Sequence, residues 1–158
     1  MKRIICLTLV FMLLFVGCSS KEKAKFYYCR SEFQYDTQDS VIVSEMRDVS
    51  GHIKDLSFLI SLYLVGPLEK ESISPFPAGV KLLRTQFVDG NLMIVLSAIN
   101  SITDSDYTLA CACLAMTCLE LTNANNVTIV SGNRSVTIDP SMLTLYDSGL
   151  PTETTTGG

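Results

Sequence analysis

Cysteine is the residue type that offers the most chemistry in this chain, which has six cysteines and a single histidine. Cys111, Cys113 and Cys118 form a Cys-x-Cys-x4-Cys cluster, and Cys29 lies far before it. Zinc sites use paired CxxC knuckles or added histidines in turns, whereas the neighbours here are Ala, Leu and Met. The spacing therefore favours buried thiols that act as small apolar side chains, and we predict no metal site.

A disulfide is the second chemistry that these thiols offer. In a helix, Cys111 and Cys118 are separated by roughly 10 Å, which exceeds the limit near 7 Å for a disulfide. Cys111 and Cys113 point to opposite sides of such a helix. If the first strand lies under the helix, Cys29 reaches Cys111 or Cys118, so the sequence leaves a disulfide with either one open.

Acid–base and nucleophilic catalysis find little support in the sequence. His52 precedes a predicted helix, has no nucleophile pattern around it, and is expected to be a surface or capping residue. Asp104 and Asp106 suit a helix start, and no glycine-rich phosphate loop occurs. We therefore predict no catalytic residue and no cofactor, and we expect the protein not to be an enzyme.

The first eighteen residues have the features of an export signal. Lys2 and Arg3 precede an uncharged run over 4–16, which is too short for the roughly 20 residues that span a bilayer as a helix. The run ends in Gly17-Cys18 and is followed by polar residues. This arrangement resembles the bacterial lipobox, which implies that Cys18 is lipidated and tethers the chain to the extracytoplasmic face of the cell membrane.

The chain then divides into a signal peptide (1–17), a lipidated cysteine with its linker (18–25), one domain (26–147) and a disordered tail (148–158). The lysines of the linker either attract anionic lipid or keep the linker solvated. Loss of two basic residues with the signal lowers the formal net charge from −4 to −6. An acidic surface of this kind argues against nucleic acid as a partner.

Hydrophobic periodicity places two helices among six strands. Alternating or β-branched runs predict strands at 26–29, 41–43, 80–88, 91–97, 127–130 and 135–138, and helical spacing predicts helices over 53–65 and 103–121. We expect a loop over 68–79. The order β-β-α-β-β-α-β-β predicts an α+β fold, with two helices packed on one face of a mostly antiparallel sheet.

Local signals mark the ends of several elements. Ser50 is a candidate N-cap for the first helix, and Gly66-Pro67 ends that helix. Asp89-Gly90 predicts a tight hairpin, because glycine accepts the positive φ of a type I′ turn. Thr103, followed three residues later by Asp106, resembles a capping box for the second helix.

Four pieces in order, the last of them the second helix with the strand 126–130, resemble the GerMN domain of sporulation and germination proteins. The segment 58–67, FLISLYLVGP, is similar to the LLxGP helix end of that family. The segment 77–83, PAGVKLL, resembles its entry into a hairpin, and 87–97, FVDGNLMIVLS, resembles the hairpin itself. The family-motif residues Gly66, Pro67, Pro77, Gly79 and Gly90 are expected to be structural.

The resemblance implies a fold similar to ring-building domains and a non-enzymatic module of the cell envelope. Its partner would be an envelope or membrane protein, or a second copy of the chain, in sporulation, germination or envelope assembly. Two alternatives remain open at this point: a surface lipoprotein that binds a small ligand or metal, and an accessory to a cell-wall hydrolase.

Overall fold

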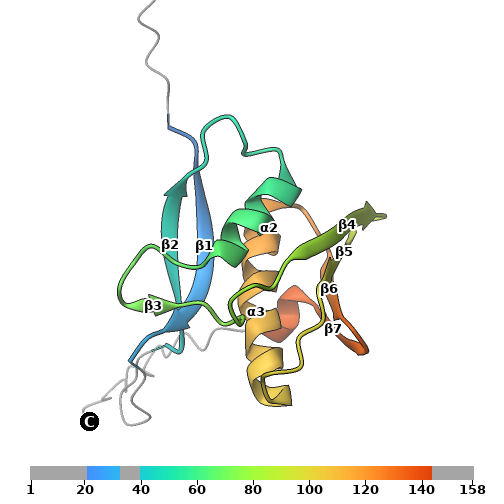
Figure 1. Cartoon of the computed structure of the whole chain (residues 1–158). Coiled ribbons are helices and arrows are strands. Elements are labelled where there is room, and N and C mark those ends of the chain that lie inside the picture. The colour runs from blue at the N-terminus through green and yellow to red at the C-terminus, as the bar shows by residue number, and fades with distance from the viewer. Residues whose placement is uncertain (1–20, 33–39, 144–158) are drawn as a thin grey trace, which may run out of the picture.

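Two β-sheets lie on either side of a helical layer in the computed structural model, which describes residues 21–32 and 40–143 (Figure 1). The predicted signal peptide, the predicted lipidation site Cys18, most of the turn after the first strand and the predicted tail lie outside the described residues. In the helical layer, α2 (Leu56–Val65) and α3 (Asp104–Leu121) each contribute side chains to a shared core. Neither helix combines the length and apolar character that a membrane crossing needs, within the part of the chain described.

The first sheet is antiparallel, with the strand order β2-β1-β3. It comprises β1 (Lys23–Arg30), β2 (Ile42–Asp48) and the two-residue β3 (Ser72–Ile73). Phe26 and Tyr28 alternate with more exposed residues along β1 and point into the core. Because β1 starts at Lys23, it takes up the last three residues of the predicted linker, and β3 lies in the predicted loop.

The second sheet has the order β4-β5-β6-β7. It comprises β4 (Leu82–Val88), β5 (Asn91–Leu96), β6 (Asn126–Ser131) and β7 (Arg134–Ile138), and a short 3-10 helix, η1 (Pro140–Leu143), follows. The β4–β5 and β6–β7 pairs are antiparallel hairpins, whereas β5 and β6 pair in parallel. The parallel pair arises because the chain crosses over through α3 between these two strands.

The α+β class and the predicted order of the main elements are confirmed, but the strands form two sheets where one was expected. The reason lies in α3, which is buried on opposite sides. Tyr107 lies against Arg134 of β7 in the second sheet, whereas Thr117 bonds to Tyr27 of β1 in the first sheet. A helix with two buried sides separates the strands instead of covering one face of a continuous sheet.

The start of α2 differs from the predicted one. Asp55 is the N-cap, and its carboxylate accepts a hydrogen bond from the Phe58 N–H at 3.0 Å. Ser50 instead donates to Asp48 through both its amide and its hydroxyl, which closes the turn after β2. His52 is exposed in the intervening loop, where its ring stacks on Phe58 with centroids 4.0 Å apart.

The cap predicted for α3 is confirmed. Thr103 is the N-cap, and its hydroxyl accepts from the Asp106 N–H at 3.2 Å and donates to the Asp106 carboxylate at 2.7 Å. Arg134 adds a second tie at this end, because it donates to Asp104 and to the carbonyl of Thr103. These bonds fix the first turn of α3 against β7.

Helix α3 also packs along β1 on its second buried side. The Tyr27 N–H donates to the Thr117 hydroxyl at 2.9 Å, and the Tyr27 hydroxyl donates to Glu120 at 3.3 Å. Thr117, only 1% exposed, donates in turn to the Cys113 carbonyl. A strand amide that would otherwise lack a partner is thus satisfied by a helix side chain.

We expect Thr117→Val, which keeps the side-chain shape, to lower the free energy of unfolding by about 1–3 kcal/mol because it leaves the shielded Tyr27 N–H without a partner. Urea denaturation measures the loss. Thr137→Val is the matched control, since that exposed hydroxyl bonds only to Thr128 at the surface. Equal losses in the two variants would contradict the role given to Thr117.

Candidate functional site

A buried ion pair fixes the end of α2 against the first sheet. Arg47 and Glu45 both lie on β2, and the Arg47 Nε is 2.5 Å from the Glu45 Oε1. Their side chains are 4% and 3% exposed, respectively. Arg47 donates to the carbonyls of Leu62 and Gly66, where a helix end attracts positive charge. The Glu45 carboxylate accepts from the Leu68 N–H at 3.1 Å. The pair therefore satisfies backbone groups on both sides of the Gly66-Pro67 motif.

Gly66 turns the chain out of α2, and its φ of 107° is a conformation that side chains with a Cβ rarely adopt. Its N–H donates to the Tyr63 carbonyl, so the predicted C-cap is confirmed. The turn leaves two large apolar side chains in solvent, one on each side of Gly66-Pro67. Val65 is 81% exposed and Leu68 is 79% exposed.

The second family motif forms a turn opposite this helix end. Gly79 has a φ of 87°, and the Val80 N–H donates to the Pro77 carbonyl at 3.5 Å. A groove of about 410 Å³ separates the turn from α2; Leu64 and Val65 line it on the helix side, and residues 78–82 line it on the other. The two motifs thus form the walls of one groove.

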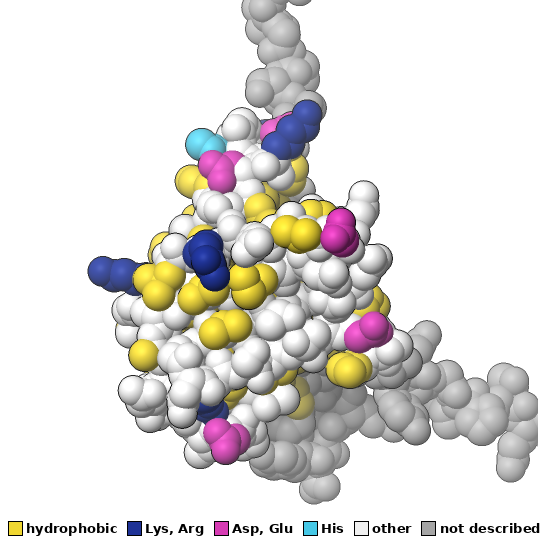
Figure 2. Space-filling view, turned by 90° about the vertical axis from the view of Figure 1, so that its right-hand side faces the viewer, with side chains coloured by type: hydrophobic (Ala, Val, Ile, Leu, Met, Phe, Trp, Pro, Cys, Tyr) yellow, Lys and Arg dark blue, Asp and Glu magenta, His cyan; other side chains and the backbone are white. Residues whose placement is uncertain are grey.

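Strand β4 continues from this groove as an edge of the second sheet. Among the described residues, β4 pairs only with β5. Its residues are mostly exposed; Leu83 is 64%, Phe87 50% and Val88 49% exposed. Figure 2 looks onto the side of the molecule where this sheet lies and shows hydrophobic side chains gathered between scattered charges. We name Val65, Leu82, Leu83, Phe87 and Val88 the β4 surface.

The β4 surface carries two features that limit indiscriminate strand pairing. The register with β5 shifts between Leu82 and Arg84, which marks a bulge, and Arg84 places an exposed positive charge on the strand. The Asp89-Gly90 turn ends the strand, with φ values of 51° and 77° that fit the predicted type I′ hairpin. A Cβ on Gly90 would lie 2.4 Å from the Asn125 amide nitrogen.

The four cysteines of the domain are buried and free. The Sγ atoms of Cys29 and Cys113 lie 3.9 Å apart, so Cys29 lies opposite Cys113 and not opposite Cys111 or Cys118, the two partners that the sequence left open. Cys113 shares a side of α3 with Thr117, four residues on, and that side faces β1. Burial raises the pKa of Cys111 to about 11 and that of Cys118 to about 12, as expected for structural thiols.

The other side chains weighed for catalysis make contacts that stabilise the fold. His52 stacks on the ring of Phe58, and Asp104 and Asp106 belong to the start of α3, where they bond to Arg134 and Thr103. Within 21–32 and 40–143, no group of three His, Cys, Asp or Glu side chains is placed to hold a metal ion. The β4 surface, which exposes large apolar side chains on and beside a strand edge that is unpaired among the described residues, is the candidate site for binding a partner.

Comparison with known proteins agrees with this fold. Neither protein-family models nor curated proteins match the sequence. The structure of the tandem GerMN domains of the sporulation protein GerM from Bacillus subtilis superposes with a TM-score of 0.50 and 17% identity. The match covers 75% of this chain and 41% of that one. The chain therefore carries a domain with a GerMN-like fold.

A second solved structure is also similar to the GerMN-like domain. It is from Clostridium perfringens, is provisionally named a lipoprotein, and superposes with a TM-score of 0.44 and 21% identity. That match covers 73% of this chain and 77% of the other. At 17% identity, the likeness to the GerM domains shows the fold alone. The GerMN-like domain spans less than half of the tandem protein from Bacillus subtilis.

We expect Arg47→Met to destabilise the GerMN-like domain by about 3–5 kcal/mol, because it leaves the Glu45 carboxylate buried without its cation. Combining it with Glu45→Gln should cost less than the sum of the two single losses, since either single change already breaks the pair. Denaturant unfolding of the three variants measures this coupling. Arg84→Met, an exposed arginine, is the control and should change stability by about 0.5 kcal/mol or less. Additive losses would contradict a coupled pair.

Proposed function

We propose that the protein is a membrane-anchored envelope lipoprotein whose GerMN-like domain acts as a non-enzymatic protein-interaction module, in sporulation, germination or envelope assembly. The observation that carries this proposal is the β4 surface, a strand edge that is unpaired among the described residues and has large exposed apolar side chains on it and beside it. Unpaired strand edges with flanking apolar pockets recognise extended peptide segments.

The mode of binding follows from the chemistry of the β4 surface. An extended segment of an envelope protein, or of a second copy of this chain, would pair with β4 through backbone hydrogen bonds. Its side chains would enter the groove between Val65 and Leu82, which sets the choice of partner. Arg84 on the same strand favours a segment with an acidic residue opposite it.

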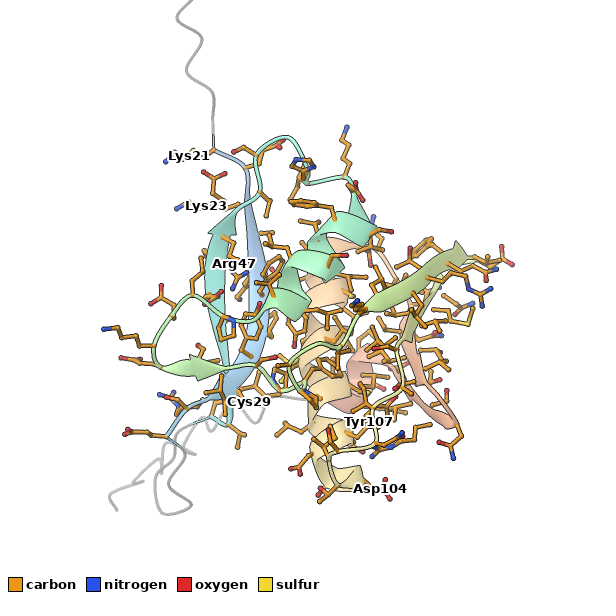
Figure 3. All side chains as sticks on the ribbon, viewed as in Figure 1. Lys21, Lys23, Cys29, Arg47, Asp104 and Tyr107 are labelled. Carbon is orange, nitrogen blue, oxygen red and sulfur yellow. The ribbon has the colours of Figure 1, made fainter. Side chains whose placement is uncertain are left out.

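The anchor at Cys18 would hold the β4 surface close to the lipid. Because β1 starts at Lys23, the intervening chain reaches at most roughly 18 Å when extended. Figure 3 shows Lys21 and Lys23 where the described chain begins. The pKa of Asp48 is lowered mainly by hydrogen bonds from Ser50, and also by these two lysines. Because Asp48 offsets part of the positive charge of these lysines, we expect the acyl chains on Cys18 to provide most of the attachment to the membrane.

Two alternative functions are weighed against the same structural observations. The first is binding of a small ligand or metal, for which the described residues contain no cluster of metal-ligating side chains. A role as accessory to a cell-wall hydrolase would use the same β4 surface and differ only in the partner. The identity of the protein bound there therefore distinguishes this role from the others.

The anchor is tested by intact mass spectrometry of protein extracted with detergent from its native host. Wild-type protein should begin at Cys18 and carry the added mass of a diacylglyceryl group. Cys18→Ala should lose that mass and keep its signal peptide, because acylation precedes cleavage. Cys6→Ala is the matched control and should remain acylated. A wild-type protein without lipid at Cys18 would rule out the anchor and leave the domain proposal in place.

The β4 surface is tested by photo-crosslinking in the native host. A benzophenone amino acid replaces Phe87 or Val65, and Met142, which is 70% exposed on η1, is the control position. We expect a discrete crosslinked protein from Phe87 and Val65 and none from Met142. Leu83→Asp should reduce that product about tenfold or more, because a charge enters an apolar contact. No product from Phe87 and Val65, or an equal one from Met142, would contradict the proposal.

A further inference from the structure

Cys29 and Cys113 form a pair of thiols at the contact between the first sheet and α3. Their Sγ atoms are 3.9 Å apart, although 84 residues separate them in the chain. Cys29 is 7% exposed and Cys113 is fully buried. Figure 3 labels Cys29 near one end of β1, on the side of the sheet toward α3. A disulfide requires the two sulfurs to close to about 2.0 Å, so a shift of about 2 Å suffices.

Regular structure on both sides keeps these thiols opposed. Two residues along β1 from Cys29, the Tyr27 N–H bonds to Thr117, which lies four residues along α3 from Cys113. Two strand residues span about 6.6 Å and four helical residues about 6 Å, so the two elements remain in register. Cys111 and Cys118 lie off this line, which explains why Cys113 alone meets Cys29.

The two thiols also differ in acidity in the way that disulfide exchange requires. The hydrogen bond from the Cys113 thiol stabilises a thiolate on Cys29 and lowers the pKa of Cys29. The same interaction, together with burial, raises the pKa of Cys113. Cys29 is therefore the thiol that ionises first and the one with some solvent exposure.

We propose that Cys29 and Cys113 are a redox-active dithiol that closes to a disulfide when the folded protein meets a disulfide oxidant. The Cys29 thiolate attacks one sulfur of the oxidant, forms a mixed disulfide and releases a thiolate. Cys113 then loses its proton to a released thiolate and attacks the Cys29 sulfur, which expels the second thiolate. Two protein thiols are oxidised and one disulfide is reduced to two thiols.

The disulfide would tie α3 to β1 and close a loop of more than eighty residues. Cross-links over long loops restrict the unfolded chain most, so oxidation should raise the midpoint of thermal unfolding by on the order of 10 °C. The chemistry depends only on the two thiols and does not require the anchor or the β4 surface. Failure of either of those proposals would leave this one intact.

The experiment uses the full chain with Cys6→Ser and Cys18→Ser, purified in detergent, so that the four domain cysteines are the thiols present. It is incubated with oxidised glutathione while folded, and is separately refolded from guanidinium in a glutathione redox buffer. We expect the thiol count after denaturation to fall from four to two. Trypsin should release a disulfide-linked pair of peptides, 26–30 and 85–134, about 2 Da lighter than the sum of the reduced peptides.

Single alanine variants identify the second cysteine within peptide 85–134. Cys113→Ala should abolish the linked pair, whereas Cys111→Ala and Cys118→Ala should retain it. Refolding in the redox buffer removes limited access as a cause of failure, because the thiols are exposed before the protein folds. Four thiols after both treatments, a link that survives Cys113→Ala, or only single glutathione adducts would each overturn the proposal.

Discussion

The buried pair of Glu45 and Arg47 is the interaction on which the rest of the structure depends. Ionised groups leave water at a cost of several kcal/mol each, which is offset only when their hydrogen bonds are complete. Arg47 gains these bonds from the end of α2, and Glu45 gains them from the backbone after Gly66. The Arg47 guanidinium also lies 5.4 Å from the ring centroid of Phe26. The hydrogen bonds of this pair are therefore complete only when the first sheet, the end of α2 and the turn after Gly66 are all formed.

This constraint extends to the proposed binding surface. Gly66-Pro67 directs the chain away from α2, and Val65 is left facing the groove that residues 78–82 close. If the end of α2 moved, one wall of the groove would move with it. The family motifs shape this groove, and in the proposed function they act by placing the apolar side chains of the β4 surface.

Features encoded in a few neighbouring residues could be predicted from the sequence. The Thr103 cap, the Asp89-Gly90 turn and the end of α2 at Gly66 each depend on short-range geometry. The start of α2 was misplaced because Ser50 and Asp55 are both good caps, and the turn after β2 uses Ser50. Local sequence cannot decide between them, because the choice depends on what the neighbouring strand requires.

The resemblance implies an interaction module, but the place of its contact surface on the fold comes from the structure. The split into two sheets and the Cys29–Cys113 contact were missed, because both depend on which side of α3 meets β1. One signal was available: Cys113 and Thr117 are four residues apart, and a polar threonine on a buried side suggests a bond to a strand edge. The Glu45–Arg47 alternation on β2 was a second signal, since opposite charges two residues apart share one face of a strand.

The strands of the first sheet differ from β4 in how well they are protected against pairing. Helix α3 satisfies an amide of β1, β3 is only two residues long, and β2 turns its charged pair inward. Each of these is a known protection against pairing with another chain. β4 has a bulge and one arginine, yet it is seven residues long and exposes large apolar side chains to solvent. An edge that is restrained in register but remains accessible is suited to a selective partner, and this contrast favours β4 as the interaction site.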